Sequence, residues 1–142
     1  VQTADKAMLV RGDQIQLQQV VLNLLINARD ALRMVEDRER RLDMQLFELG
    51  DTELPPQMIL PEDLSRQAAI LLTITDNGCG MDEATQKKVF EPFFTTKPVG
   101  QGTGMGLAMA YGTIQSHGGA IGISSQPGVG TKIYIVLPKL VS

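Results

Sequence analysis

The spacing of hydrophobic residues changes along the chain between the period of a helix and the period of a strand. Between residues 16 and 32, apolar side chains recur at intervals of three and four, which predicts a helix with one face toward a core. That face consists of Leu17, Val20, Val21, Leu24, Leu25, Ala28, Ala31 and Leu32. Leu22 and Ile26 make the far side apolar too, so we expect the helix to be deeply covered.

Several other segments have the composition of strands. Residues 42–46 alternate apolar and polar side chains, and residues 69–75 are β-branched and apolar enough for a central strand. Segments 120–125 and 131–137 flank a proline–glycine turn and predict a closing hairpin. Residues 6–10 could form one more short strand. We therefore expect a sheet built from segments spread over the whole chain.

The remaining segments predict two helices and two irregular connections. Asp82 is a suitable N-cap for a short helix over residues 82–89, and a second helix is expected over residues 104–116. Residues 49–67 contain three prolines and several acidic residues, which predicts a long surface loop between two strands of a hairpin. Residues 91–103 are rich in proline, threonine and glycine, and we expect them to be irregular and mobile.

Composition narrows the classes of protein that fit. A chain of 142 residues suits one domain, here residues 1–142, and 43% hydrophobic with 20% charged residues is an ordinary globular balance. The net charge of −3 and an aromatic content of 4% disfavour nucleic acid as a partner. A single cysteine, Cys79, excludes an internal disulfide and fits a reducing compartment. No apolar run approaches the ~18 residues of a membrane span, so we expect no direct membrane contact.

Polar residues on the first helix suggest a metal site. Asn23, Asn27 and Asp30 share a face beside the apolar one, and polar groups buried in such a helix cost free energy unless they are bonded. Because Mg²⁺ between ATP phosphates needs only one or two protein oxygens, the Asn27 amide would suffice as a ligand. Asn23 could add a second ligand or hold a bound water. The alternative, that both amides are structural, has equal weight from the helix alone.

The segment DNGCGM, residues 76–81, suggests a base pocket. Asp76 ends an apolar strand, so its carboxylate should lie at the mouth of the core, where it can accept a hydrogen bond from the exocyclic amine of adenine. Gly78 and Gly80 would let the base approach the backbone. The alternative is an ordinary Asp-Asn-Gly turn that ends a strand, and for this motif alone we favour that alternative.

The segment GTGMGL, residues 102–107, suggests a phosphate site, because free amides at a helix start attract anions and glycines admit them closely. Lys97 and Thr103 could add contacts to the phosphates, whereas a glycine-rich helix start without a ligand is the alternative. Phe93 and Phe94, beside the mobile segment, could anchor a lid or dock a partner. His117 fits a helix cap better than a catalytic role.

Together these segments resemble the sequence boxes of sensor histidine kinases. NLLINARDAL resembles their N box, DNGCGM the first glycine box, FEPFFTTKP the F box and GTGMGL the second glycine box, and PGVGT with IYIVLP resembles the closing hairpin. The match runs from about residue 12 to residue 138 and is closest to the nitrogen-regulator and hybrid kinases. The resemblance implies an α/β fold of the α+β two-layer type, in which a mixed sheet is backed by about three helices and a flexible lid covers ATP.

The resemblance also implies roles for individual residues. Asn27 would bind magnesium with help from Asn23, Asp76 would recognise adenine, and Thr131 would lie behind the base beside Asp76. Many members carry a basic residue where this chain has Asp30, which shifts one phosphate contact toward Lys97. The full set implied to contact the nucleotide is Asn27, Asp30, Asp76, Gly78, Gly80, Met81, Phe94, Lys97, Gly102, Thr103, Gly104, Met105, Gly106, Leu107 and Thr131.

The implied function is that of the ATP-binding half of a histidine kinase. Such a domain donates the γ-phosphate of Mg-ATP to a histidine on a separate dimerisation hairpin, which this chain lacks, and a response-regulator receiver domain acts downstream. We therefore expect a cytoplasmic, monomeric piece of a longer protein whose other parts can be membrane-anchored. Two alternatives stay open: an ATP-hydrolysing relative of the gyrase, MutL or chaperone type, although Asn23 replaces the glutamate that activates water there, and a degenerate nucleotide-binding scaffold.

Overall fold

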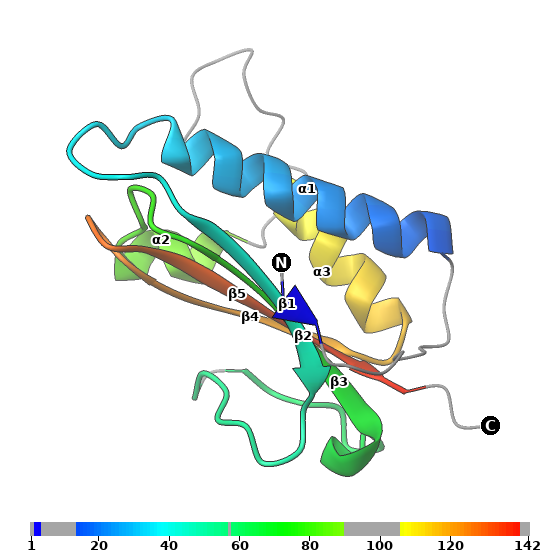
Figure 1. The fold of residues 1–142 in the computed structure, drawn as a ribbon. Coiled ribbons are helices and arrows are strands. Elements are labelled where there is room, and N and C mark those ends of the chain that lie inside the picture. Colours follow the sequence, from blue (N-terminus) through cyan, green and yellow to red (C-terminus); the bar gives the residue numbers. More distant parts are fainter. Residues whose placement is uncertain (1, 4–13, 57, 90–105, 140–142) are drawn as a thin grey trace.

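A mixed five-stranded sheet forms the centre of the molecule. The computed structural model describes residues 2–3, 14–56, 58–89 and 106–139 (Figure 1). Its strands are β1 (Gln2–Thr3), β2 (Leu42–Glu48), β3 (Ala69–Asp76), β4 (Ala120–Gln126) and β5 (Gly130–Pro138), in the order β1-β2-β3-β5-β4. β1 pairs in parallel with β2, and the other neighbours are antiparallel. The predicted hairpins 42–75 and 120–137 are therefore confirmed.

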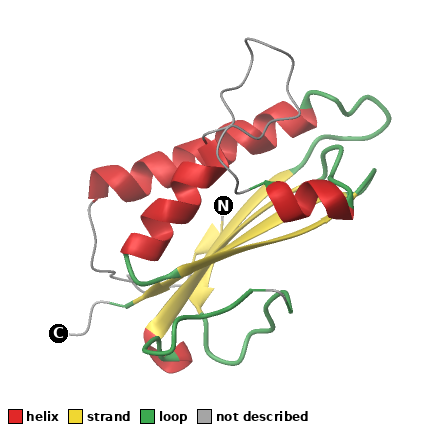
Figure 2. Ribbon diagram, turned by 180° about the vertical axis from the view of Figure 1, so that it is seen from behind, coloured by secondary structure: helices red, strands yellow, loops and turns green. Residues whose placement is uncertain are grey.

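Helices cover one face of this sheet. α1 (Gln14–Leu32) and α3 (Gly106–Ser116) pack together over it, and the short α2 (Glu83–Lys88) lies toward its other end beside β4 (Figures 1 and 2). The Asp82 carboxylate accepts a hydrogen bond of 2.7 Å from the Thr85 amide, so this residue caps α2 as predicted. A two-layer α+β arrangement with a mixed sheet and three helices in the described part confirms the predicted fold class.

Two hydrophobic cores form because successive side chains of a strand point to opposite faces of the sheet. The larger core lies between the sheet and the helices, where Val20 and Leu24 of α1 meet Ile114 of α3. The sheet contributes residues spaced two apart to this core: Ile70 and Ile74 of β3, Ile121 and Ile123 of β4, and Ile133, Ile135 and Leu137 of β5. The smaller core, on the opposite face, is built around Leu49, Ala69, Leu71 and Val136.

The long connection between β2 and β3 covers that second face. It is irregular, as predicted, except for a short 3₁₀-helix, η1 (Arg66–Ala68). The prediction of a surface loop was incomplete, because its apolar residues pack on the sheet: Leu54, Met58, Leu60 and Leu64. The Arg66 guanidinium donates from Nε to the Gly50 carbonyl over 2.9 Å and also bonds the Thr52 carbonyl. The connection is therefore a fixed cover for the sheet.

The two sides of α1 differ in how far they are covered. The prediction that α1 is deeply covered was wrong for its far side, where Leu22 is 50% exposed, because no element packs there in the described part of the chain. The core-facing residues were predicted correctly, with Val20, Leu24 and Ala28 all buried. The strand predicted over residues 6–10 lies outside the described residues.

Candidate nucleotide-binding site

A row of polar side chains crosses the helix-covered face at the point where the hydrophobic core ends. Asp76 is the last residue of β3, its register partner in β5 is Thr131, and the next partner in β4 is Ser125. Asp76 and Thr131 are only 7% and 9% exposed, and the Ser125 and Thr131 hydroxyl oxygens are 2.8 Å apart. Each residue lies two positions along its strand from a core isoleucine of the same face: Asp76 follows Ile74, Ser125 follows Ile123, and Thr131 precedes Ile133. The row is therefore part of the sheet and closes its core.

The Asp76 carboxylate is desolvated and held by backbone amides. Gly78 N–H donates to Oδ1 over 2.9 Å. Burial raises the pKa of Asp76 from its ordinary value, and the hydrogen bonds from the Gly78 and Thr131 amides oppose that rise. A buried carboxylate with fixed orientation is a strong acceptor for a further donor, such as the amine of a purine.

The turn after Asp76 fits only glycine at two positions. A Cβ atom on Gly78 would lie 2.9 Å from atoms of Ala31 in α1. Gly80 has a φ of +70°, and a Cβ there would lie 2.0 Å from the Gln126 carbonyl oxygen. The turn is therefore wedged between α1 and the β4–β5 hairpin. Met81 N–H anchors its far end by donating to the Ser125 hydroxyl over 2.8 Å.

The contact between Gly78 and Ala31 places the relevant part of α1 beside this turn. Asn27 lies one helical turn before Ala31 and therefore on the same side of α1. Asn23, one turn earlier, accepts a hydrogen bond of 3.1 Å at Oδ1 from the Gln19 amide. Asp30 has a different environment, with ion pairs of 3.4 Å to Arg29 of the same helix and 3.8 Å to Arg33, the residue after its end. Its charge is thus balanced by neighbouring arginines.

The other predicted site residues divide into two groups. Met81 and Leu107 are partly buried and pack against the larger core, and Gly106 is the first residue of α3. The remaining positions lie outside the described residues: Phe94, Lys97, Gly102, Thr103, Gly104 and Met105. The structure therefore brings Asp76, Gly78, Gly80 and Thr131, which are predicted to surround the base, together near α1.

His117 has the surroundings that the sequence analysis predicts, and Cys79 lies in the glycine turn. The His117 Nδ1 atom lies 2.7 Å from the Thr113 carbonyl oxygen, so its imidazole caps the end of α3. Cys79 contributes its carbonyl, which accepts a hydrogen bond of 2.8 Å from the Gly128 amide. Neither side chain belongs to the polar row.

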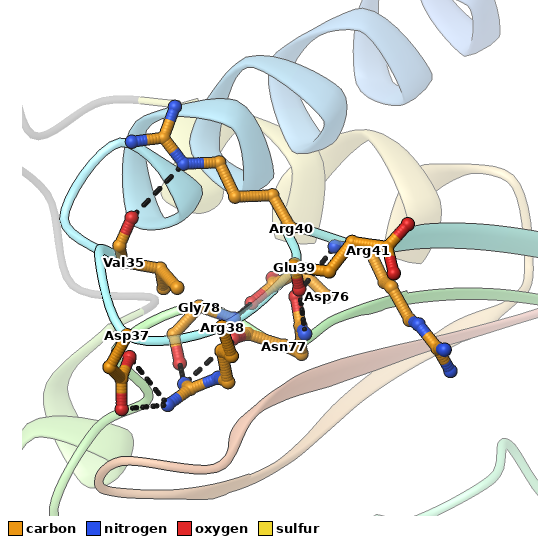
Figure 3. A network of polar contacts seen from close by, with 9 residues as sticks. All are labelled: Val35, Asp37, Arg38, Glu39, Arg40, Arg41, Asp76, Asn77 and Gly78. Carbon is orange, nitrogen blue, oxygen red and sulfur yellow. Dashed lines mark hydrogen bonds and ion pairs between the residues drawn. The ribbon is translucent and has the colours of Figure 1, made fainter.

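Sequence reasoning missed two residues that contact the site. Ser125 could have been found, because it occupies the next core-facing position after Ile121 and Ile123 and is polar. Arg38 gave no such signal, since residues 36–41 only indicated a charged helix end. In the structure its guanidinium donates to the carbonyls of Asn77 and Gly78 (Figure 3).

Two properties of the described residues bear on cofactors and membranes. They contain no group of three or more His, Cys, Asp or Glu side chains that could hold a metal ion. Within the same part of the chain, every helix is too short or too polar to cross a membrane.

Comparison with known proteins shows the family to which this fold belongs. Residues 12–141 match the family described as histidine kinase-, DNA gyrase B-, and HSP90-like ATPase. The chain therefore belongs to this family, and membership implies that it binds nucleotide. Within the family its similarity is to sensor histidine kinases, which favours that interpretation over the hydrolysing relatives.

Relatives and solved structures agree on this point. The chain is 40% identical over 132 residues to sensor kinase CckA of Brucella abortus and 38% identical over 129 residues to the histidine-protein kinase AtoS of Escherichia coli. These alignments cover 93% and 91% of this chain but only 13% and 18% of the relatives' lengths. The catalytic domain of histidine kinase ThkA has a TM-score of 0.69 and 26% identity, covering 97% of this chain and 76% of that one.

Proposed function

We propose that residues 1–142 form a single catalytic domain that binds Mg-ATP and donates the γ-phosphate to a histidine on a separate dimerisation hairpin of its parent kinase. The observation that carries this proposal is the buried Asp76 carboxylate at the end of β3. It lies in a row with Thr131 and Ser125, under a glycine turn that contacts α1. The similarity to sensor histidine kinases supports the choice of phosphoacceptor.

In this proposal the base pocket lies at the polar end of the sheet. The Asp76 carboxylate accepts the hydrogen bond of the adenine amine, and Thr131 lies behind the base. Gly78 and Gly80 keep the wall of the pocket free of side chains. Further contacts with the nucleotide fall to Met81, Phe94, Thr103, Met105 and Leu107.

The phosphates and the metal bind between α1 and the start of α3. Gly102, Gly104 and Gly106 present backbone amides to the phosphates, and Lys97 adds a positive charge. The Asn27 amide oxygen, assisted by Asn23, holds Mg²⁺, which neutralises phosphate charge when it is bound. The Asp30 carboxylate, paired with Arg29 and Arg33, lies at the margin of this site.

The reaction that suits these residues is in-line transfer to an imidazole. The domain positions the γ-phosphate, and the attacking nitrogen comes from the dimerisation hairpin. Asn23 stands where hydrolysing relatives have a glutamate, and an amide is a poor base for water. A receiver domain then takes the phosphoryl group from the histidine, and we place this relay in the cytoplasm.

Calorimetric titration with a non-hydrolysable ATP analogue tests the site, with and without Mg²⁺. A lost hydrogen bond to a charged group should weaken binding of Asp76→Asn by roughly 10- to 100-fold in both conditions. Asn27→Ala should weaken it only when Mg²⁺ is present. Asp82→Asn, which alters an exposed carboxylate outside the site, is the control. Absence of saturable binding at millimolar analogue would contradict the proposal and favour a scaffold.

A second assay tests the phosphoacceptor. The domain is mixed with the separately prepared histidine hairpin of its parent and with ATP labelled at the γ-phosphate. We expect acid-labile label on the hairpin and very slow release of phosphate by the domain alone. Steady hydrolysis that Asn23→Ala abolishes, without transfer to the hairpin, would assign the chain to the hydrolysing relatives.

A further inference from the structure

The segment that follows α1 is bonded to the glycine turn of the base pocket (Figure 3). Arg38 donates to the Asn77 carbonyl from Nε over 3.1 Å and from Nη2 over 2.8 Å. The same Nη2 donates to the Gly78 carbonyl over 2.8 Å. On its other side, Nη1 lies 3.3 Å from the Asp37 carboxylate. The guanidinium is thus fixed between an acid and two carbonyls of the turn.

Asn77 also forms hydrogen bonds with the segment that follows α1. Its Nδ2 donates to the Glu39 carbonyl over 2.7 Å, and its Oδ1 accepts from the Arg41 amide over 2.7 Å. Its own amide donates to the Arg41 carbonyl over 3.2 Å. The segment and the turn therefore form one bonded unit, although they are almost forty positions apart in the sequence.

The Gly78 residue links this unit to the base-recognising carboxylate. Its carbonyl accepts from Arg38, and its amide donates to Asp76 Oδ1 over 2.9 Å. Because glycine has no side chain to restrict its backbone, the orientation of this residue depends on such external bonds. The planar guanidinium is suited to the task, since its donors have a fixed spacing and its charge strengthens each bond.

We propose that Arg38 is a positioning residue of the nucleotide site, which holds the Asn77–Gly78 turn so that the Asp76 carboxylate faces the adenine amine. The inference rests on the proposed function and adds a determinant of base selectivity to it. Arg38 acts through Gly78 and Asp76 and does not touch the base.

Two other arginines separate this role from general stabilisation. Arg66 also bonds two loop carbonyls, those of Gly50 and Thr52, but on the opposite face of the sheet. Arg40 lies in the same segment as Arg38 and bonds the Val35 carbonyl over 3.1 Å, away from the turn. Arg40 also bonds the Arg33 carbonyl over 3.4 Å, so replacing either arginine removes bonds to two carbonyls without changing the support of Gly78.

The test compares the dissociation constants of ATP and of purine riboside triphosphate, which is ATP without the exocyclic amine, for this domain. The unmodified domain should prefer ATP by roughly tenfold or more, because the amine bonds a charged acceptor. Arg38→Met should lower that preference at least threefold, with little change in the affinity for the amine-free analogue. Arg38→Lys, which keeps the charge but not the fork of donors, should fall between the two. Arg66→Met and Arg40→Met should keep the full preference.

Each variant is first melted, and binding is measured well below its unfolding temperature. If Arg38→Met does not fold, Arg38→Lys decides the question by its preference. An unchanged preference, or equal weakening for both nucleotides, would overturn the role of Arg38 and leave it as a stabilising residue. Failure of the unmodified domain to bind ATP would instead overturn the proposed function itself.

Discussion

The two faces of the sheet are built from the same strands but have different covers. One face lies under α1 and α3 and ends in the polar row of Asp76, Thr131 and Ser125. The other lies under the irregular connection between β2 and β3, and its core surrounds Leu71, which is 0% exposed. Both faces are closed, but among the described residues only the helix-covered face combines a buried carboxylate with a glycine turn.

In strand β3, residues on one face therefore support folding, whereas residues on the other face can contact a ligand. In β3, Leu71 points to the irregular cover, whereas Ile74 and Asp76 point to the helices. A residue on the face under the irregular connection can affect a ligand only by changing the stability of the whole domain. A residue at the polar end of the helix-covered face can affect a ligand directly, at little cost in stability.

The largest expected effect is the loss of stability in Leu71→Ala. Removing a fully buried leucine typically costs about 2–5 kcal/mol in the free energy of unfolding, because a cavity remains. Urea denaturation would measure that loss. Since Leu71 faces away from the helices, the affinity for ATP should stay unchanged wherever the variant is folded. A loss of affinity in the fully folded variant would show that the two faces are coupled.

A smaller effect should come from a matched pair of threonines, one on each face. Thr131 lies in the polar row, and Thr73, which is 2% exposed, lies on the opposite face of β3. Thr131→Val removes the hydroxyl that lies 2.8 Å from Ser125, and we expect ATP binding to weaken by about 3- to 10-fold. Calorimetry on Thr73→Val should show unchanged binding. Equal losses in the two variants would mean that neither hydroxyl acts through the nucleotide site.

Much of the fold could be predicted because regular packing leaves a periodic pattern. The core-facing residues of α1 recur at three and four and residues 42–46 alternate, so both were found from spacing, whereas β3 was found from its β-branched and apolar composition. The cover of the second face was not predicted, because residues 49–65 have no repeating period from which their apolar contacts could be read. The exposure of Leu22 was missed for a related reason, since apolar character does not reveal whether another element packs against it.

The candidate site likewise contains residues that could be predicted from the sequence and residues that could not. Asp76 and the glycines were predictable because the chemistry of a base pocket restricts those residue types locally, and the structure brings them beside α1 and Thr131. Their roles toward a nucleotide stay predictions. Arg38 was invisible because its contacts join positions distant in sequence, and a charged residue after a helix is ordinary. Ser125 could have been found from the alternation of β4, but its pairing with Thr131 needed the register of the folded sheet.

The smallest expected effect is on the pH dependence of stability, where two aspartates have opposite signs. Burial raises the pKa of Asp76, so its favourable contribution is complete below the unfolded value of 3.8 and is lost as the pH rises through the folded pKa. Hydrogen bonds from Thr85 lower the pKa of Asp82, so its contribution is present above 3.8 and is lost as the pH falls through the folded pKa. Relative to Asp76→Asn, the unmodified domain should therefore become less stable as the pH rises from about 3.8. Relative to Asp82→Asn, it should become more stable as the pH rises through the acidic range up to that value. Denaturant unfolding at a series of pH values measures both differences, which should be well below the cost of Leu71→Ala. The opposite sign for Asp76→Asn would contradict this expectation. It would mean that the hydrogen bonds from the Gly78 and Thr131 amides stabilise the ionised carboxylate of Asp76 more than burial destabilises it.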